Sequence, residues 1–230
     1  MPHALVLSHD WIAYELGHLE PWLDAHGFSV TRAFREAPRD LPAADLLIVL
    51  GSPGSVADGG CPPASQGEIT TVRDWVEGGR PYLGICFGAQ VLALATGGDV
   101  RRMPVPYEDY AELDLADDAP RPVAGPWVVW HNDGITAPAA ASVLGSLDHA
   151  DLVFRTRRAW GVQPHLEVNA GILERMAIAL GSPATTYGPI VERLRSDEDA
   201  NAARARSLLD AFLDDTATDR PRAGRGPRRG

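Results

Sequence analysis

The first part of the chain consists of short apolar runs separated by longer amphipathic stretches. Four of these runs are typical of buried strands, over residues 4–7, 28–34, 45–50 and 82–85. Helices are predicted between them over 15–26 and 66–77, because apolar residues recur there at helical spacing and glycine follows each segment. Strands that alternate with helices in this way predict a parallel α/β sheet with right-handed crossovers and helices on both faces. The run D-L-L-I-V-L at 45–50 is the most apolar and is expected in the interior of the sheet.

The pattern changes after residue 98. Further strands are predicted over 99–103, 110–115, 127–130 and 151–155, without helices between them. Such a run favours an antiparallel extension of the sheet, and residues 160–168 then return to the core. A helix is expected over 169–180, with Asn169 as its N-cap and Gly181 beyond its end. A second, strongly charged helix is expected over 190–212.

The length of 230 residues suits one domain with a sizeable core, which we assign to residues 1–215. Residues 216–230 are rich in arginine, glycine and proline, and we expect them to form a disordered basic tail.

The charged residues and cysteines exclude several classes of function. The net charge of -10 argues against a nucleic-acid-binding surface. All 21 positive charges are arginines, which excludes a lysine nucleophile, a Schiff-base lysine and a P-loop lysine. The two cysteines do not make a disulfide framework, and no signal peptide or membrane span is apparent. We therefore expect a cytoplasmic protein that binds neither nucleic acid nor membrane.

The candidate chemistry is centred on Cys86. This residue stands between the strand 82–85 and a small-residue helix predicted over 87–96, with Gly84 and Gly88 two residues to either side. A nucleophile elbow needs this spacing, because side chains at both flanking positions would collide with the neighbouring strand and helix. The turn places the sulfur at a helix N-terminus, where free N–H groups and the helix dipole stabilise a thiolate. Taken alone, Cys86 is equally well explained as a small buried apolar residue.

A thiol nucleophile needs a base and a group that orients the base. His165 is the late histidine with a carboxylate at a useful spacing, since Glu167 follows two residues later. On an extended chain both side chains project to the same side, so the carboxylate can bond one ring nitrogen while the other faces the sulfur. The other histidines, His3, His9, His18, His26 and His149, show no metal-ligand spacing, so neither a metal nor a cofactor is expected.

Four separated blocks resemble one known family. G-I-C-F-G-A-Q (84–90) and G-V-Q-P-H-L-E (161–167) are similar to the triad-type, or class I, glutamine amidotransferases, and most similar to the glutaminase domain of GMP synthase and its stand-alone relatives. L-G-S-P-G-S-V (50–56) resembles the family's oxyanion loop, and V-V-W-H-N-D (128–133) resembles its glutamine-binding segment. The resemblance implies a three-layer, flavodoxin-like α/β fold whose mostly parallel central sheet carries an antiparallel extension.

The resemblance also implies roles for individual residues. The catalytic residues are Cys86 as nucleophile, His165 as general base and later acid, and Glu167 as the group that orients the imidazole. The oxyanion hole is made by the backbone N–H groups of Ser52 and Phe87. The substrate-binding residues are Gly54, Gln90, Asn132 and Asp133, with Asp133 as the partner of the substrate ammonium.

Some positions depart from the family's pattern. Ser52 stands where the most similar relatives have glycine, which makes a positive φ harder to reach. Leu166 replaces the proline of H-P-E, and Pro164, which has no N–H, replaces an aromatic residue. His131 is interpreted either as a substrate ligand or as a packing histidine in a turn. The second interpretation stays open because the neighbouring Asn132 and Asp133 are the better ligands.

Three functions remain open. The first is hydrolysis of the glutamine side-chain amide, with ammonia passing to a separate synthase because nothing after Val168 resembles an acceptor domain. The second is a stand-alone γ-glutamyl peptidase, which cuts the same carbonyl with another leaving group; the stretch 107–118, acidic and aromatic, is expected to form the pocket wall that decides between them. The third is a non-catalytic domain that binds a ligand or partner.

Overall fold

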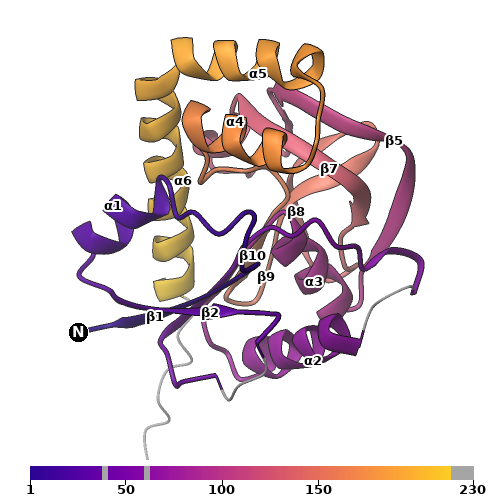
Figure 1. The fold of residues 1–230 in the computed structure, drawn as a ribbon. Helices are drawn as coiled ribbons and strands as arrows, with labels where there is room; N and C mark the ends of the chain where they lie inside the picture. The colour runs from indigo at the N-terminus through magenta and orange to yellow at the C-terminus, as the bar shows by residue number, and fades with distance from the viewer. Residues whose placement is uncertain (38–40, 60–62, 219–230) are drawn as a thin grey trace, which may run out of the picture.

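An eight-stranded sheet lies at the centre of the molecule, in the order β2-β1-β3-β4-β10-β9-β8-β6 (Figure 1). The computed structural model describes residues 1–37, 41–59 and 63–218. The strands of the sheet are β1 (His3–Ser8), β2 (Ser29–Phe34), β3 (Leu46–Val49), β4 (Tyr82–Ile85), β6 (Asp114–Leu115), β8 (Ser142–Leu147), β9 (Ala150–Thr156) and β10 (Ala159–Val162). The strands from β2 to β10 pair in parallel, and β9, β8 and β6 continue the sheet antiparallel. The predicted parallel sheet with an antiparallel extension is confirmed, and β3 lies in its interior.

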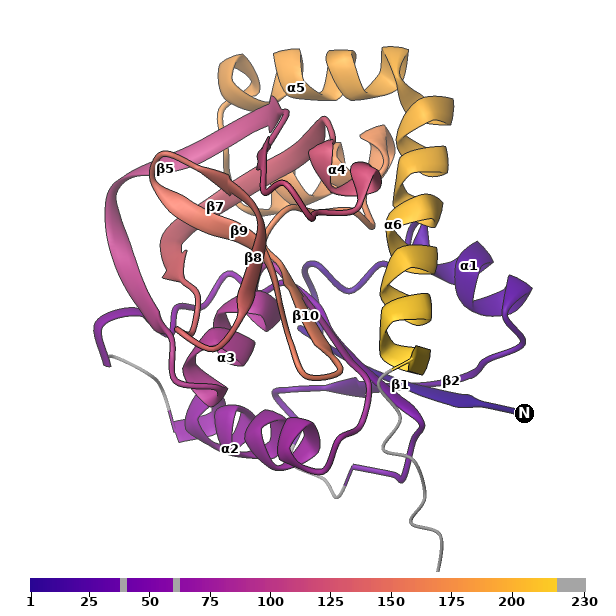
Figure 2. The same ribbon diagram turned by 180° about the vertical axis from the view of Figure 1, so that it is seen from behind.

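Helices cover both faces of the sheet (Figures 1 and 2). The helices are α1 (Leu19–Ala25), α2 (Pro63–Glu77), α3 (Phe87–Ala95), α4 (Ala170–Ala179), α5 (Ala184–Ser196) and α6 (Glu198–Thr218), with short 3-10 helices η1 (Ala57–Gly59) and η2 (Arg121–Ala124). Alternate residues of β1 face opposite layers: Ala4 and Val6 pack with α1 and α6, whereas Leu5 and Leu7 pack with α2 and α3. The same alternation occurs in β3. Strands whose sequences are continuous apolar runs therefore contribute to two apolar cores, one on each face of the sheet.

A separate antiparallel ribbon corrects one sequence prediction. Among the described residues, β5 (Asp99–Ala111) pairs with β7 (Trp127–Thr136) and with no strand of the main sheet. The two strands predicted over 99–103 and 110–115 are thus mostly one long strand outside the main sheet. The register shifts between Arg102 and Tyr107, where Pro104 and Pro106 lack the N–H groups that a regular ladder needs. The backbone nevertheless stays extended through both prolines, so the strand continues. The strand β8 was not predicted.

The helix predicted over 190–212 is in fact two helices. α5 begins before Pro189, and the chain turns at Asp197, whose carboxylate accepts a 2.6 Å hydrogen bond from the Tyr110 hydroxyl. α6 then extends to Thr218, so residues 216–218 of the predicted tail are helical, and the rest of that tail lies outside the described residues, as does Cys61.

The first predicted helix is shorter than expected, because α1 begins at Leu19 rather than near residue 15. Gly17 adopts a φ of 48°, and a Cβ there would lie 1.8 Å from the carbonyl oxygen of Glu167. This close approach leaves no room for a side chain at position 17. The N–H of His18 donates to the same carbonyl oxygen at 2.9 Å, so the segment before α1 lies against Glu167.

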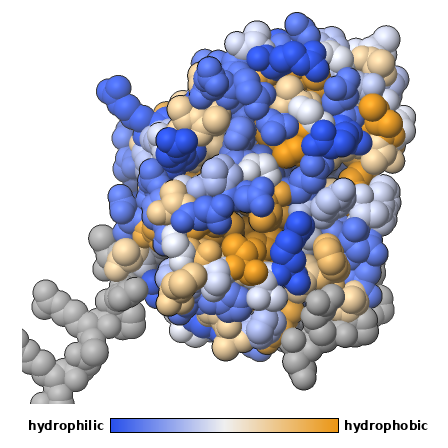
Figure 3. All heavy atoms as spheres, turned by 60° about the vertical axis from the view of Figure 1, so that its left-hand side comes forward, coloured by the Kyte–Doolittle hydropathy of each residue, from blue (hydrophilic) through white to orange (hydrophobic). Residues whose placement is uncertain are grey.

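The edge strand β2 borders a hollow of about 640 Å³ that is separate from the pocket at Cys86 described below. Its lining includes the apolar side chains of Leu16, Leu23 and Phe28 and the charged side chains of Arg32 and Arg175. Figure 3, in which the side carrying α1 comes forward, shows hydrophobic side chains exposed between hydrophilic ones. Within the three described ranges, no helix is both long and apolar enough to cross a lipid bilayer.

Candidate active site

Cys86 lies on a sharp turn between β4 and α3. Its φ of 51° and ψ of -106° are rare for a residue with a side chain and mark a strained backbone. A Cβ on Gly84 would lie 2.4 Å from the backbone of Gly88, and a Cβ on Gly88 would lie 2.1 Å from the carbonyl oxygen of Val49. Both flanking positions therefore require glycine. The strand–Cys–helix turn is present as the sequence predicts, with Cys86 at the N-cap of α3 and no side-chain cap bond.

His165 and Glu167 come from the segment that follows β10. The backbone N–H of His165 donates to the carbonyl oxygen of Val128 at 2.8 Å, which holds the segment against the β5–β7 ribbon. The side chains of His165 and Glu167 are both buried, and Nδ1 of the imidazole lies 2.7 Å from Oε1 of the carboxylate. With Nδ1 bonded to Glu167, Nε2 is the nitrogen left for Cys86.

Opposing effects act on the pKa of His165. Burial disfavours the imidazolium and by itself would lower the pKa. The charge of Glu167, together with the charge and hydrogen bond of Cys86, outweighs burial and raises the pKa well above its usual value of 6.5. The imidazole is thus held in its protonated form between a carboxylate and the sulfur, where it can donate a proton to a leaving group.

These side chains open into a pocket of about 90 Å³ at the carboxyl edge of the sheet. Its lining includes seven residues singled out from the sequence, namely Ser52, Gly54, Cys86, Gln90, Asn132, Asp133 and His165. Glu167 lies behind His165, and Phe87 lies beside Cys86 as the first residue of α3. The structure therefore brings all nine predicted site residues to one place.

The loop after β3 lies over Cys86. Ser52 is not among the described residues with a positive φ, so a serine is accommodated there, and its Oγ accepts a 3.1 Å hydrogen bond from the N–H of Gly54. A Cβ on Gly51 would lie 3.3 Å from Cε1 of His165 and 3.8 Å from Cβ of Cys86. A side chain at position 51 would therefore meet both Cys86 and His165 in van der Waals contact, and the glycine leaves this space open.

The opposite side of the pocket carries a buried carboxylate. Oδ2 of Asp133 accepts a 2.6 Å hydrogen bond from the Ser55 hydroxyl, and Nη1 of Arg102 lies 3.0 Å from Oδ1 in an ion pair without hydrogen-bond alignment. The buried amide of Gln90 donates to Oε1 of Gln163 at 3.3 Å. Ser55, Arg102 and Gln163 were not identified from the sequence, although Ser55 and Gln163 lie inside the motifs that were.

The pocket wall differs from the sequence expectation. No residue of the stretch 107–118 is in the lining; instead, apolar side chains of Ile12, Trp130, Met176 and Leu180 form the wall. Trp130 of β7 lines the pocket whereas its partner strand β5 does not, and Met176 of α4 and Leu180 at the C-cap of that helix take the place expected for residues 107–118. In the sequence, the apolar residues of α4 that line the pocket have the same spacing as apolar residues of an ordinary core-packing helix, so the pattern could not separate the two.

His131 is a buried residue in the middle of β7 rather than in a turn. Its Nδ1 donates to the carbonyl oxygen of Asp133 at 2.8 Å, and its Nε2 lies 3.3 Å from Nε2 of His149, whose ring stacks on Tyr107. Burial is the main cause that lowers the pKa of His131 to about 4, with smaller contributions from His149 and His165. His131 is therefore neutral at pH 7 and supports the segment that carries Asp133.

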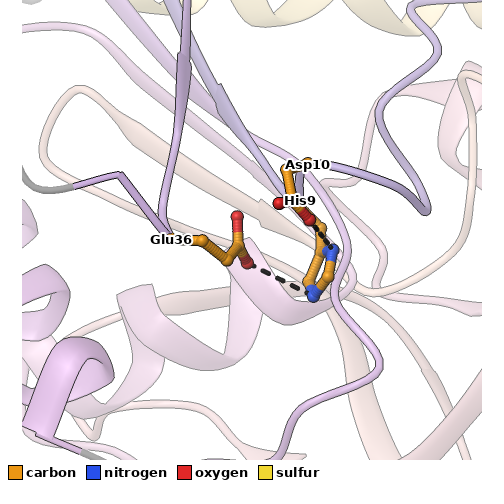
Figure 4. Close-up of side chains that lie close together, drawn as sticks. All are labelled: His9, Asp10 and Glu36. Carbon is orange, nitrogen blue, oxygen red and sulfur yellow. Dashed lines mark ion pairs between the residues drawn. The ribbon is translucent and has the colours of Figure 1, made fainter.

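A second group of titratable side chains lies at the ends of β1 and β2 (Figure 4). His9, Asp10 and Glu36 are the one such set, in the part of the chain that the structure describes, whose atoms are close enough to hold a metal ion. Nδ1 of His9 lies 3.2 Å from Asp10 and Nε2 lies 3.2 Å from Glu36. Because the two ring nitrogens point in opposite directions, a single ion could use only one of them. The geometry is that of a histidine between two carboxylate partners.

Comparison with known proteins defines the class of this protein. The family described as "Glutamine amidotransferase class-I" matches residues 11–179. The match covers most of the chain, so the protein belongs to the class I glutamine amidotransferases. The resemblance seen in the four sequence blocks is thereby confirmed.

Among sequence relatives, the chain is 31% identical over 176 residues to the glutamine-hydrolyzing GMP synthase of Serratia proteamaculans, an alignment covering 65% of this chain and 32% of that protein. It is 35% identical over 128 residues to the same-named protein of Symbiobacterium thermophilum, covering 51% of this chain and 25% of that protein. The chain thus spans about a third or less of the length of these relatives.

Solved structures confirm the fold. A glutamine amidotransferase from Thermotoga maritima superimposes with a TM-score of 0.79 at 21% identity, over 92% of this chain and 98% of that one. A glutamine amido transferase from Methylobacillus flagellatus gives 0.78 at 17% identity and covers both chains completely.

Proposed function

We propose that this protein hydrolyses the side-chain amide of glutamine through a γ-glutamyl thioester on Cys86. The observation that carries the proposal is the buried chain of interactions from Glu167 through His165 to Cys86, in which the carboxylate contacts Nδ1 at 2.7 Å and the pKa of the imidazole is raised in part by Cys86. A nucleophile, a proton carrier and an orienting carboxylate are the parts that acyl transfer to a thiol needs.

In the first half of the reaction, the Cys86 thiolate attacks the γ-carbonyl carbon. The carbonyl oxygen gains negative charge, which the backbone N–H groups of Ser52 and Phe87 stabilise. The C–N bond then breaks, the imidazolium of His165 gives its proton to the departing nitrogen, and ammonia leaves. Donors placed in this way are typically worth about 3 to 4 kcal/mol each in the transition state.

In the second half, neutral His165 takes a proton from water as the hydroxide attacks the thioester carbon. The C–S bond breaks, glutamate is released and Cys86 returns as a thiolate paired with imidazolium. Throughout both halves Glu167 keeps the ring in the tautomer that presents Nε2 to the sulfur and stabilises its positive charge.

Recognition of the amino-acid end of glutamine is assigned to the far side of the pocket. The Asp133 carboxylate accepts a hydrogen bond from Ser55 and pairs with Arg102, which orients it to receive the α-ammonium group. The exposed amide of Asn132 and the backbone of Gly54 complete this subsite.

A γ-glutamyl hydrolase with the same triad is the second candidate, and the apolar wall of the pocket favours it. Ammonia gains nothing from contact with Ile12, Met176 and Leu180, whereas an apolar amine or amino-acid leaving group would bury its surface against them. The sequence relatives named as GMP synthases favour instead an ammonia-accepting synthase as partner.

Direct measurement of the products separates these candidates. The purified chain is given glutamine or γ-glutamyl-leucine, and release of ammonia or leucine is measured. Cys86→Ala should lower either activity by at least about a thousandfold, whereas Cys61→Ser, at the other cysteine of the chain, should keep it. Absence of both products, together with equal iodoacetamide labelling of the two cysteines, would leave a binding domain as the correct assignment.

A further inference from the structure

Arg35 connects three parts of the molecule that meet beneath the proposed oxyanion hole. It follows β2, and its side chain is 9% exposed. Nη1 donates to the carbonyl oxygen of Gly51 at 2.9 Å, and Nη2 donates to that of Leu50 at 3.2 Å. The guanidinium also lies 4.6 Å from the centre of the Phe87 ring. One side chain therefore contacts the loop that carries Ser52 and the first residue of α3.

The charge of Arg35 is balanced within the same layer. Glu68 of α2 has a side chain that is 5% exposed, and its two carboxylate oxygens accept from Nε at 3.2 Å and from Nη2 at 3.3 Å. This forked pairing holds the plane of the guanidinium in one orientation, which a lysine could not reproduce. The remaining donors are consequently directed at the two loop carbonyls.

The bond to Gly51 sets the direction of one particular peptide. The carbonyl of Gly51 and the N–H of Ser52 belong to the same planar peptide unit, and in a trans peptide they point in opposite directions. Because Arg35 holds the carbonyl, the N–H of Ser52 is turned away from Arg35. Ser52 lines the pocket together with Cys86 and His165, so we expect this N–H to point towards the pocket.

We infer that Arg35 is a positioning residue for the oxyanion hole, which it builds by fixing the Gly51–Ser52 peptide and by packing on Phe87. The inference rests on the proposed function, because the hole acts only if a tetrahedral intermediate forms. Without Arg35, rotation of the peptide would direct the Gly51 carbonyl at the developing negative charge. The acyl-transfer step would then become slower, whereas the sulfur of Cys86 would keep its own reactivity.

The test removes the ion pair without leaving a buried charge. In the double variant Arg35→Met, Glu68→Leu, apolar side chains of similar size replace both partners, which favours a folded protein. We expect kcat to fall by about a hundredfold or more with KM nearly unchanged. Alkylation of Cys86 by iodoacetamide, which passes through no oxyanion, should keep its rate. Arg35→Lys should recover part of kcat, because it restores one donor.

The control is Arg73→Gln, which removes an arginine of α2 whose Nε donates to the carbonyl oxygen of Ala95 at 3.3 Å. This variant should keep kcat. A crystal structure of the double variant should show the Gly51–Ser52 peptide rotated or in two orientations. An unchanged peptide, an unchanged kcat, or a parallel loss of kcat and alkylation rate would each overturn the inference. A wild-type chain that hydrolyses neither substrate would overturn the proposed function instead, and the crystallographic comparison would still decide the role of Arg35.

Discussion

Replacing Gly88 with alanine tests the geometry on which the whole site depends. The added Cβ would lie 2.1 Å from the carbonyl oxygen of Val49 and 3.0 Å from its Cβ. Neither atom can rotate away, because the first belongs to the backbone and the second is attached to it. Ordinary contact begins near 3.4 Å, so the start of α3 must move away from β3 by about 1 Å.

Two consequences follow from this displacement. Overpacking of a close-packed interior typically costs about 1 to 3 kcal/mol of the free energy of unfolding. Cys86 is the residue before α3, so it moves relative to His165 and the 50–56 loop, and a shift of about 1 Å in a reacting group can lower kcat by about a hundredfold. Urea unfolding and product release measure the two effects separately.

Gly67→Ala is the matched control for this change. Gly67 is exposed in α2, and a Cβ there would meet nothing within 4 Å. Alanine should therefore raise the free energy of unfolding by roughly 0.5 to 1 kcal/mol and leave kcat unchanged. If Gly88→Ala unfolds at the same urea concentration as the wild type and keeps its activity, the close approach of α3 to β3 does not control the site.

Two further predictions concern the histidines. Glu167→Gln removes the largest of the charges that raise the pKa of His165, so the pKa of the buried ring should fall. The value of kcat should decrease by about a thousandfold to ten-thousandfold, and a loss below tenfold would contradict the assigned role. His131 is buried with a pKa of about 4, against 6.5 when unfolded, so the unfolded chain binds more protons between these pH values and the native state is destabilised as pH falls through this window. Unfolding measured at pH 7.5 and pH 4 should therefore show a loss about 3 kcal/mol larger in the wild type than in His131→Gln, and equal losses would refute the buried, neutral state.

Features that depend on neighbouring residues were predictable from the sequence. The elbow needs glycine at 84 and 88 because steric contacts arise within a few residues, and those residues can be read directly. Asn169 caps α4 as expected, with its side chain accepting a 2.9 Å bond from the N–H of Ile172, because capping is also a local bond. The spacing of His165 and Glu167 was informative for the same reason.

Features that depend on how distant segments meet were decided by the tertiary structure. Asp197, at the break between α5 and α6, bonds Tyr110, and Gly17, just before the late start of α1, lies against the carbonyl oxygen of Glu167. Each of these partners lies far away in sequence, so no local pattern records the contact.

The sequence by itself determined the order of strands and helices in the parallel half, the turn at Cys86 and the residues that could do chemistry there. Only the folded chain decided which side chains form the wall of the pocket, which carboxylate Arg102 pairs with, and that Arg35 bonds the loop beside Cys86. The physical reason is that backbone sterics and hydrogen bonds within a turn act over a few residues. The direction of a buried charged side chain is set instead by every layer that packs around it.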